Sequence, residues 1–204
     1  MHIQWLGAGA FKLQVKPVND EIVVVIDPYK QEKGNFPRSL TPHIGIATHG
    51  EDELITLSGD PFIVSIPGEY ETKNVLIQAV AGKDEQNMAI RVDAEMMSFG
   101  HFGLTKETPN DAQIEFLSGV DILAIPVGGK NSYSAEQAVK LINNIEPRIV
   151  IPYAYKSDNE PDADSVEVFL KEIGVPAEKP GTKVIIKKKD LPQEDMQIIV
   201  LEKE

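Results

Sequence analysis

The stretch Ala47-Thr48-His49-Gly50-Glu51-Asp52-Glu53-Leu54 decides how this chain is interpreted. It follows a short apolar run, so it reads as the loop that leaves a buried strand. His49, Glu51 and Glu53 are residue types that bind metals, whereas Leu54 has no donor atom. A zinc site usually needs at least three protein ligands that converge on one point. The stretch therefore has the composition of a metal-binding loop from which some ligands have been lost.

Six further segments surround this loop in a definite order along the chain. Most are apolar runs of strand character that end in small or polar residues, where a strand gives way to a loop. The order and spacing of these segments, more than the loop alone, indicate a fold. The segments are Ile3 to Leu13, Val23 to Tyr29, Ile66 to Glu71, Ser98 to Gly103, Val120 to Gly129 and Pro147 to Tyr155.

The loop and these segments together resemble the metallo-β-lactamase superfamily, in particular small metal-dependent hydrolases similar to the ascorbate-phosphate lactonase. The resemblance runs from about Met1 to Tyr155. It implies an α/β fold, a four-layer αββα sandwich in which two central sheets pack face to face with helices outside. We expect residues 1–204 to form a single metallo-β-lactamase-like domain, because this length is ordinary for one domain.

The resemblance breaks down where the family usually has histidine or aspartate. The family's loop reads T-H-x-H-x-D-H, and here it keeps only its first histidine, His49. The other diagnostic positions hold, in chain order, Ala8, Glu51, Glu53, Leu54, His101 and Ala154. Alanine and leucine cannot coordinate a metal, so a dinuclear site is not expected. What remains is a candidate mononuclear site made of His49, Glu51 and His101.

The pocket implied by the resemblance is bordered by Asp27, Glu53, Gly128 and Gly129. Asp27 ends an apolar run, and we expect it to order its loop by accepting hydrogen bonds from backbone amides. Glu53 belongs to an acidic loop that can equally be a solvated surface. The pair Gly128 and Gly129 allows a turn with positive φ.

Each candidate ligand also has a purely structural interpretation. His49 can hydrogen-bond locally at the end of its strand, and Glu51 can belong to a surface acidic loop. His101, between Gly100 and Phe102, is expected to face the pocket as a buried neutral imidazole that donates to His49 or Glu51. If the acidic loop instead converges with His101 on an ion, its oxygen ligands favour Mg²⁺, Mn²⁺ or Ca²⁺ over zinc.

The composition limits the partners and the compartment. The chain has no cysteine, which excludes disulfides and cysteine nucleophiles and favours a cytoplasmic location. A net charge of −12 argues against a nucleic-acid partner. No apolar run approaches the roughly 20 residues that span a bilayer, so no membrane partner is expected. A small molecule, another protein or a second copy of the chain remains open as the partner.

The apolar pattern predicts strands first and interspersed helices later. A hairpin turn is expected at Asp93-Ala94, and a terminal strand pair is expected between 182–187 and 197–201. Three helices are predicted. The first covers 111–117 and is capped by Asn110. The second starts at Ser134, where Ser134 and Gln137 can form a capping box, and is ended by Pro147. The third starts at Ser165 and is ended by Gly174.

Two functions follow from these observations. In the first, the metal site is lost or strongly altered, no cofactor is expected, and the chain is a non-catalytic binding or structural module. In the second, a single divalent ion held by His49, Glu51 and His101 polarises a carbonyl or phosphoryl oxygen and activates water. Leu54 and Ala154 favour the first function, whereas the polar side chains kept at Glu51 and His101 favour the second.

Overall fold

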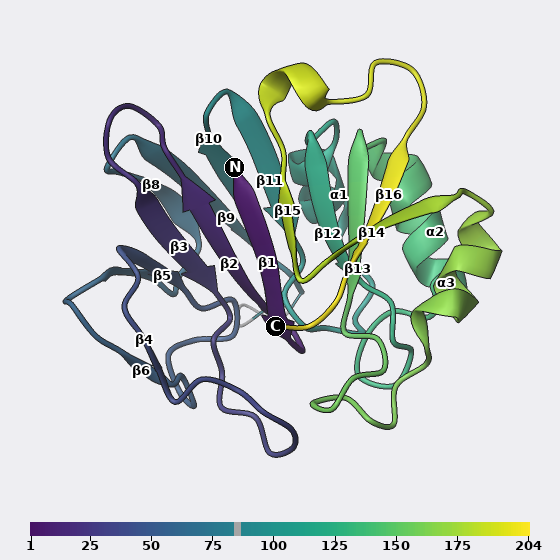
Figure 1. Cartoon of the computed structure of the whole chain (residues 1–204), viewed down its shortest axis with the longest axis horizontal. Coiled ribbons are helices and arrows are strands. Elements are labelled where there is room, and N and C mark those ends of the chain that lie inside the picture. Colours follow the sequence, from purple (N-terminus) through teal and green to yellow (C-terminus); the bar gives the residue numbers. More distant parts are fainter. Residues whose placement is uncertain (84–86) are drawn as a thin grey trace.

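The computed structural model describes residues 1–83 and 87–204. Two β-sheets lie face to face, and the space between them is filled by one continuous apolar cluster (Figure 1). Aromatic rings from both sheets meet in this cluster, among them Phe11 and Phe99, whose ring centroids are 5.9 Å apart. Burial of this apolar surface is the main favourable contribution to folding.

The first sheet has six strands, in the spatial order β15-β1-β2-β3-β5-β7. Its first three strands in sequence form an antiparallel meander, and β3, β5 and β7 then run parallel to one another. The strands are β1 (His2–Gly7), β2 (Ala10–Val15), β3 (Ile22–Ile26), β5 (Ile44–Ile46), β7 (Phe62–Val64) and β15 (Lys183–Ile185).

The second sheet has eight strands, in the spatial order β14-β16-β13-β12-β11-β10-β9-β8. Strands β8 to β11 are antiparallel, and β11, β12, β13, β16 and β14 form a parallel half. The strands are β8 (Gly68–Thr72), β9 (Val75–Ala81), β10 (Met88–Ala94), β11 (Met97–His101), β12 (Ile122–Pro126), β13 (Ile149–Tyr153), β14 (Ala177–Gly181) and β16 (Gln197–Leu201).

The three predicted helices are confirmed as α1 (Asp111–Leu117), α2 (Ala135–Ile145) and α3 (Val166–Ile173). They follow one another across the outer face of the eight-stranded sheet, where α1 contacts β9 and β10 and α2 contacts both other helices (Figure 1). Their cover explains why every residue of β12 and β13 is buried. Within the described residues, no helix has the length and apolar character needed to cross a membrane.

The outer face of the six-stranded sheet is covered differently. A small apolar cluster of Leu6, Ala10 and Val25 packs there beneath Phe36 and Leu40. The covering chain includes the two-stranded sheet of β4 (Ser39–Leu40) and β6 (Thr56–Leu57). The predicted α/β sandwich of the metallo-β-lactamase type is confirmed. On this side the outer layer is irregular chain, without an α-helix among the described residues.

Two local predictions are wrong. The turn between β10 and β11 lies at Glu95-Met96 instead of Asp93-Ala94, because these two residues adopt φ of 55° and 60° and Ala94 pairs with Met97. The terminal strands do not pair with each other. Strand β15 extends the six-stranded sheet beside β1, and β16 extends the eight-stranded sheet between β13 and β14.

Candidate functional site

A chain of hydrogen bonds joins Asp27, after β3, to His49, after β5. The Thr48 backbone N–H donates to Asp27 Oδ1 at 2.8 Å, and the Thr48 hydroxyl donates to Oδ2 at 2.6 Å. The same hydroxyl lies 2.7 Å from His49 Nδ1. Because the hydroxyl proton is used on Asp27, the hydroxyl accepts from Nδ1–H of the His49 ring. Asp27 therefore does order its loop through a backbone amide.

The Tyr29 phenol completes this loop. Its hydroxyl donates to the Gly50 carbonyl at 2.9 Å and accepts from the His49 backbone N–H at 2.8 Å. Burial raises the pKa of Tyr29 well above its usual range, so the phenol keeps its proton and its role as donor. Burial likewise raises the pKa of the Asp27 carboxyl, while His49 and the hydrogen bonds from Thr48 act in the opposite direction.

The His101 imidazole is fully buried and both of its nitrogens are engaged. The Gly103 backbone N–H donates to Nδ1 at 2.9 Å, so Nε2 carries the proton and donates to the Gly9 carbonyl at 3.0 Å. The ring also stacks on Tyr153, with centroids 4.9 Å apart and planes 6° from parallel. Burial lowers the pKa of His101 to about 3, so the ring is neutral at physiological pH.

The two histidines lie on either side of Gly103. A Cβ added at Gly103 would come within 2.9 Å of His49 Cε1 and 2.6 Å of Thr48 Oγ1, while its own amide bonds His101. The predicted donation from His101 to His49 or Glu51 is wrong, because the single N–H of the ring is used on a backbone carbonyl of the facing sheet.

Glu51 and Glu53 form no three-ligand group with the imidazoles in the described part of the chain. The Ser65 hydroxyl donates to Glu51 Oε1 at 2.7 Å on the exposed surface. The exposed Glu53 carboxylate lies 3.5 Å from Lys30 Nζ. Across residues 1–83 and 87–204, no three His, Cys, Asp or Glu side chains gather closely enough to hold a metal ion.

The alanines at the altered positions are buried and have unusual backbone geometry. Ala8 and Ala154 adopt φ of 44° and 57°, in the left-handed region that non-glycine residues rarely occupy. The Ala154 carbonyl oxygen lies close to Gly128, and a Cβ added at Gly128 would be only 2.0 Å from that oxygen. Gly129 has φ of 80°, the positive value predicted for the pair. Gly128 therefore allows a close contact between backbones, and Gly129 allows a turn with positive φ.

Of five surface hollows in the described part of the chain, none is lined by Asp27, His49 or His101. A hollow of about 690 Å³ is bordered by Leu54 together with Lys30 and other residues of the loop that follows Tyr29.

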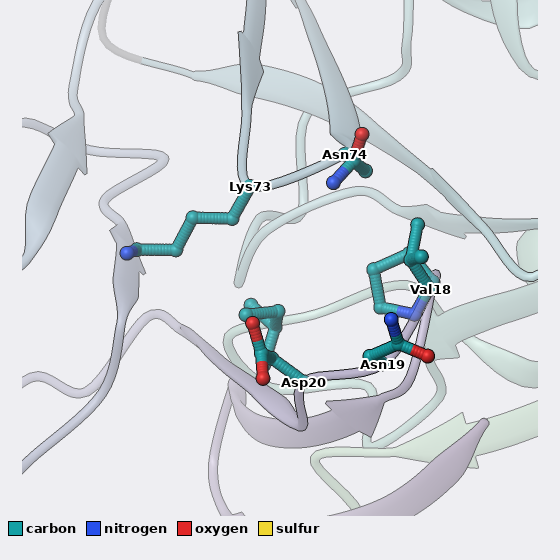
Figure 2. A pocket seen from close by; sticks show the side chains of 7 residues that line it. Val18, Asn19, Asp20, Lys73 and Asn74 are labelled. Carbon is teal, nitrogen blue, oxygen red and sulfur yellow. The ribbon is translucent and has the colours of Figure 1, made fainter.

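A second hollow, of about 240 Å³, lies between the turn that precedes β3 and the turn that joins β8 to β9. Figure 2 shows Asn74 facing Val18 across it, while the Lys73 side chain extends to one side. Asp27 follows the opposite end of β3, so this hollow is separate from the candidate site.

The sandwich and the polar residues at its strand ends define a member of the beta-lactamase superfamily. The sequence model of the Beta-lactamase superfamily domain matches residues 2–154, and the chain belongs to this family.

Similar proteins agree with this assignment. The chain is 25% identical over 205 residues to a UPF0173 protein of Pyrococcus furiosus, covering 85% of this chain and 90% of that protein. It is 23% identical over 225 residues to a UPF0173 metal-dependent hydrolase of Methanopyrus kandleri, covering 87% and 95%. A Thermotoga maritima crystal structure described as a candidate Zn-dependent hydrolase of the metallo-β-lactamase superfamily superposes with a TM-score of 0.83. In that comparison the identity is 22%, with 100% of this chain and 99% of that chain covered.

The residues of this chain do not fit the metal that the family implies. Both His101 nitrogens are engaged in hydrogen bonds, and the side chains of Leu54 and Ala154 have no donor atom. Of the two imidazoles, His49 keeps one ring nitrogen, Nε2, without a hydrogen bond among the described residues. One nitrogen falls short of the three protein ligands that zinc sites use.

Several residues that build this region were missed by the sequence analysis. Tyr29 was overlooked although it directly follows Asp27-Pro28, and Thr48 was overlooked although it adjoins His49. A hydroxyl next to a strand-end histidine is a usable signal, because it can fix the tautomer of the ring. The Tyr153 stack and the Gly9 acceptor gave no signal, since both come from distant parts of the chain.

Proposed function

We propose that this chain is a metallo-β-lactamase-fold protein that does not carry out the family's metal-dependent hydrolysis and acts as a binding module. Its partner is a small molecule or another protein, met in the cytoplasm. A chain with no cysteine and a net charge of −12 supports that location and disfavours nucleic acid.

The state of His101 carries this proposal. Its ring is buried, neutral, stacked on Tyr153 and bonded at both nitrogens. A metal could use this residue only if one of these hydrogen bonds were broken and a buried backbone group were left unpaired. Such a loss costs about 1–3 kcal/mol for each group.

Metal content tests the proposal directly. Protein without a His tag is dialysed against zinc and against manganese, free metal is removed, and bound ions per chain are counted by elemental analysis. We expect far less than one ion per chain and no metal-dependent hydrolysis. The UPF0173 metal-dependent hydrolase of Methanopyrus kandleri, treated in parallel, is the positive control.

The altered mononuclear hydrolase is the second candidate, because His49 Nε2 is free of hydrogen bonds among the described residues. One tightly held ion per chain that is lost in His49→Ala would support this candidate and contradict the binding module. If the His49→Ala variant still binds the ion, the ion is bound elsewhere, and the candidate site at His49 does not hold a metal.

A further inference from the structure

The two sheets leave free edges on the same side of the sandwich. Strand β7 is the last strand of the six-stranded sheet, β8 is the last of the eight-stranded sheet, and residues 65–67 join them. In the described part of the chain, no strand pairs with the outer edge of either one (Figure 1). The backbone groups of an unpaired edge are available to an added strand.

Apolar side chains close the gap between these two edges. Phe62 on β7 and Tyr70 on β8 are in contact, with ring centroids 6.0 Å apart and planes at 63°. The Tyr70 hydroxyl donates to the Ile66 carbonyl at 3.0 Å, which fixes the ring over the connection. Phe62 is 43% exposed and Ile66 is 65% exposed, so together they present an apolar strip to solvent.

The stretch of sequence that contains this strip is acidic. Between Arg38 and Lys73 the chain contains no lysine or arginine and six carboxylates: Glu51, Asp52, Glu53, Asp60, Glu69 and Glu71. Along β8, the exposed Glu69 and Glu71 alternate with the half-buried Tyr70. Successive side chains of a strand point to opposite faces, so one face of this edge is acidic and the other is apolar.

We propose that the free edge of β8 binds an extended segment of another protein in which basic and apolar residues alternate. Added beside β8, the apolar side chains of that segment would cover Tyr70 and Ile66. Its lysines or arginines would lie beside Glu69 and Glu71, where opposite charges in neighbouring strands attract. This inference rests on the proposed binding function and names its partner.

A second copy of the chain fits this edge poorly. If β8 paired with its own copy, Glu69 and Glu71 of both chains would lie beside one another. Like charges directly opposite in neighbouring strands are destabilising. The net charge of −12 adds a general repulsion between copies. The edge therefore suits a partner of opposite charge.

A titration with synthetic peptides tests this inference. The full chain, labelled with ¹⁵N, is titrated with a blocked peptide of alternating lysine and valine, and with a peptide of equal composition in which the two residues form separate blocks. We expect amide shifts at Gly68–Thr72 with the alternating peptide only. The double variant Glu69→Lys/Glu71→Lys reverses the charge of this edge, so it should bind the lysine–valine peptide at least about tenfold more weakly. A peptide of alternating glutamate and valine should bind this variant instead.

The matched control is Glu178→Lys on β14, the opposite edge strand of the same sheet. It should leave binding unchanged. Equal binding of the block peptide, an equal loss in Glu178→Lys, or no shift at β8 would overturn the inference. A concentration-dependent dimer that weakens in Ile66→Ser would also overturn it and assign the edge to a second copy. Counting the metal ions bound in the same samples tests the proposed function separately. One bound ion per chain would contradict the proposed function, whether or not the peptides bind.

Discussion

The His101 imidazole lies flat on the Tyr153 phenol, with ring centroids 4.9 Å apart and planes 6° from parallel. The two ring nitrogens reach backbone groups on both sides of the sandwich, Gly9 after β1 and Gly103 after β11. In this position the histidine holds the two sheets together at the edge where the candidate site lies.

Removing this ring should destabilise the protein. His101→Ala opens a cavity beside Tyr153 and leaves a buried carbonyl and a buried amide unpaired, so we expect a loss of roughly 3 kcal/mol in unfolding free energy. Urea unfolding at neutral pH measures it. His43→Ala is the control, because this exposed ring accepts one hydrogen bond, from the Val23 amide, and should cost less than about 1 kcal/mol. Equal losses in the two variants would contradict the bridging role.

The same ring predicts a pH dependence. Burial lowers the folded-state pKa of His101 from 6.5 to about 3. Below about pH 6.5 the unfolded chain takes up a proton on this ring and the folded chain does not. The unfolding free energy therefore decreases as the pH is lowered below about 6.5, by up to about 1.4 kcal/mol per pH unit.

His101→Ala lacks this proton uptake, so the stability gap between wild type and variant should narrow from about pH 7 to about pH 5. Asp27, whose pKa is raised by burial, acts in the opposite direction, but it is present in both proteins and cancels in the comparison. Urea unfolding at a series of pH values measures the gap. A gap that stays constant would show that the ring takes up its proton as readily in the folded protein as in the unfolded chain, and would contradict a lowered pKa.

Gly103 should tolerate no side chain. It has φ of 69°, and an added Cβ would lie 2.6 Å from Thr48 Oγ1 and 2.9 Å from His49 Cε1. Gly119 has the same φ of 69° with nothing within 4 Å of its added Cβ. We expect Gly119→Ala to cost about 1 kcal/mol from backbone strain alone, and Gly103→Ala to cost roughly 2 kcal/mol more from overpacking. Thermal unfolding of both variants measures the difference between their losses of stability. Equal losses would mean that Thr48 and His49 can move aside for the added methyl group at little cost.

The C-termini of two helices offer a reciprocal test. Glu146 is the residue that caps the C-terminus of α2, and Gly174 caps the C-terminus of α3. Both adopt the left-handed conformation, with φ of 54° and 68°. Glu146→Gly should therefore stabilise the protein by about 0.5–1 kcal/mol, and Gly174→Ala should destabilise it by a similar amount. The shifts are read from urea midpoints. Shifts of the same sign in the two variants would contradict the backbone explanation.

Local signals in the sequence were enough for the helices and for most strands. Helix α2 begins after a polar capping residue, as predicted: Ser134 and Gln137 form a capping box, and both partners lie within one turn of helix. Strand β14 was missed, since Ala177–Gly181 has no apolar alternation and forms through backbone pairing with β16. Pairing partners were also missed, because they depend on distant segments.

The candidate site shows the same difference between features set by local sequence and features set by contacts with distant segments. The loop position of His49 and the role of Asp27 could be predicted, since each depends on where a strand ends. The engagement of His101 could not, because its acceptor, Gly9, lies 92 residues away along the chain. Whether a histidine is free to bind a metal depends on such contacts, and a sequence motif alone does not reveal them.

The strand order has a consequence for how the chain folds. Strand β1 pairs with β15, and β16 lies between β13 and β14, so each sheet needs a strand from residues 183–201. Neither sheet can be completed until those residues have left the ribosome. Closing such long loops costs entropy before any contact forms, which slows folding. We therefore expect this fold to form slowly, and only after residues 183–201 have left the ribosome.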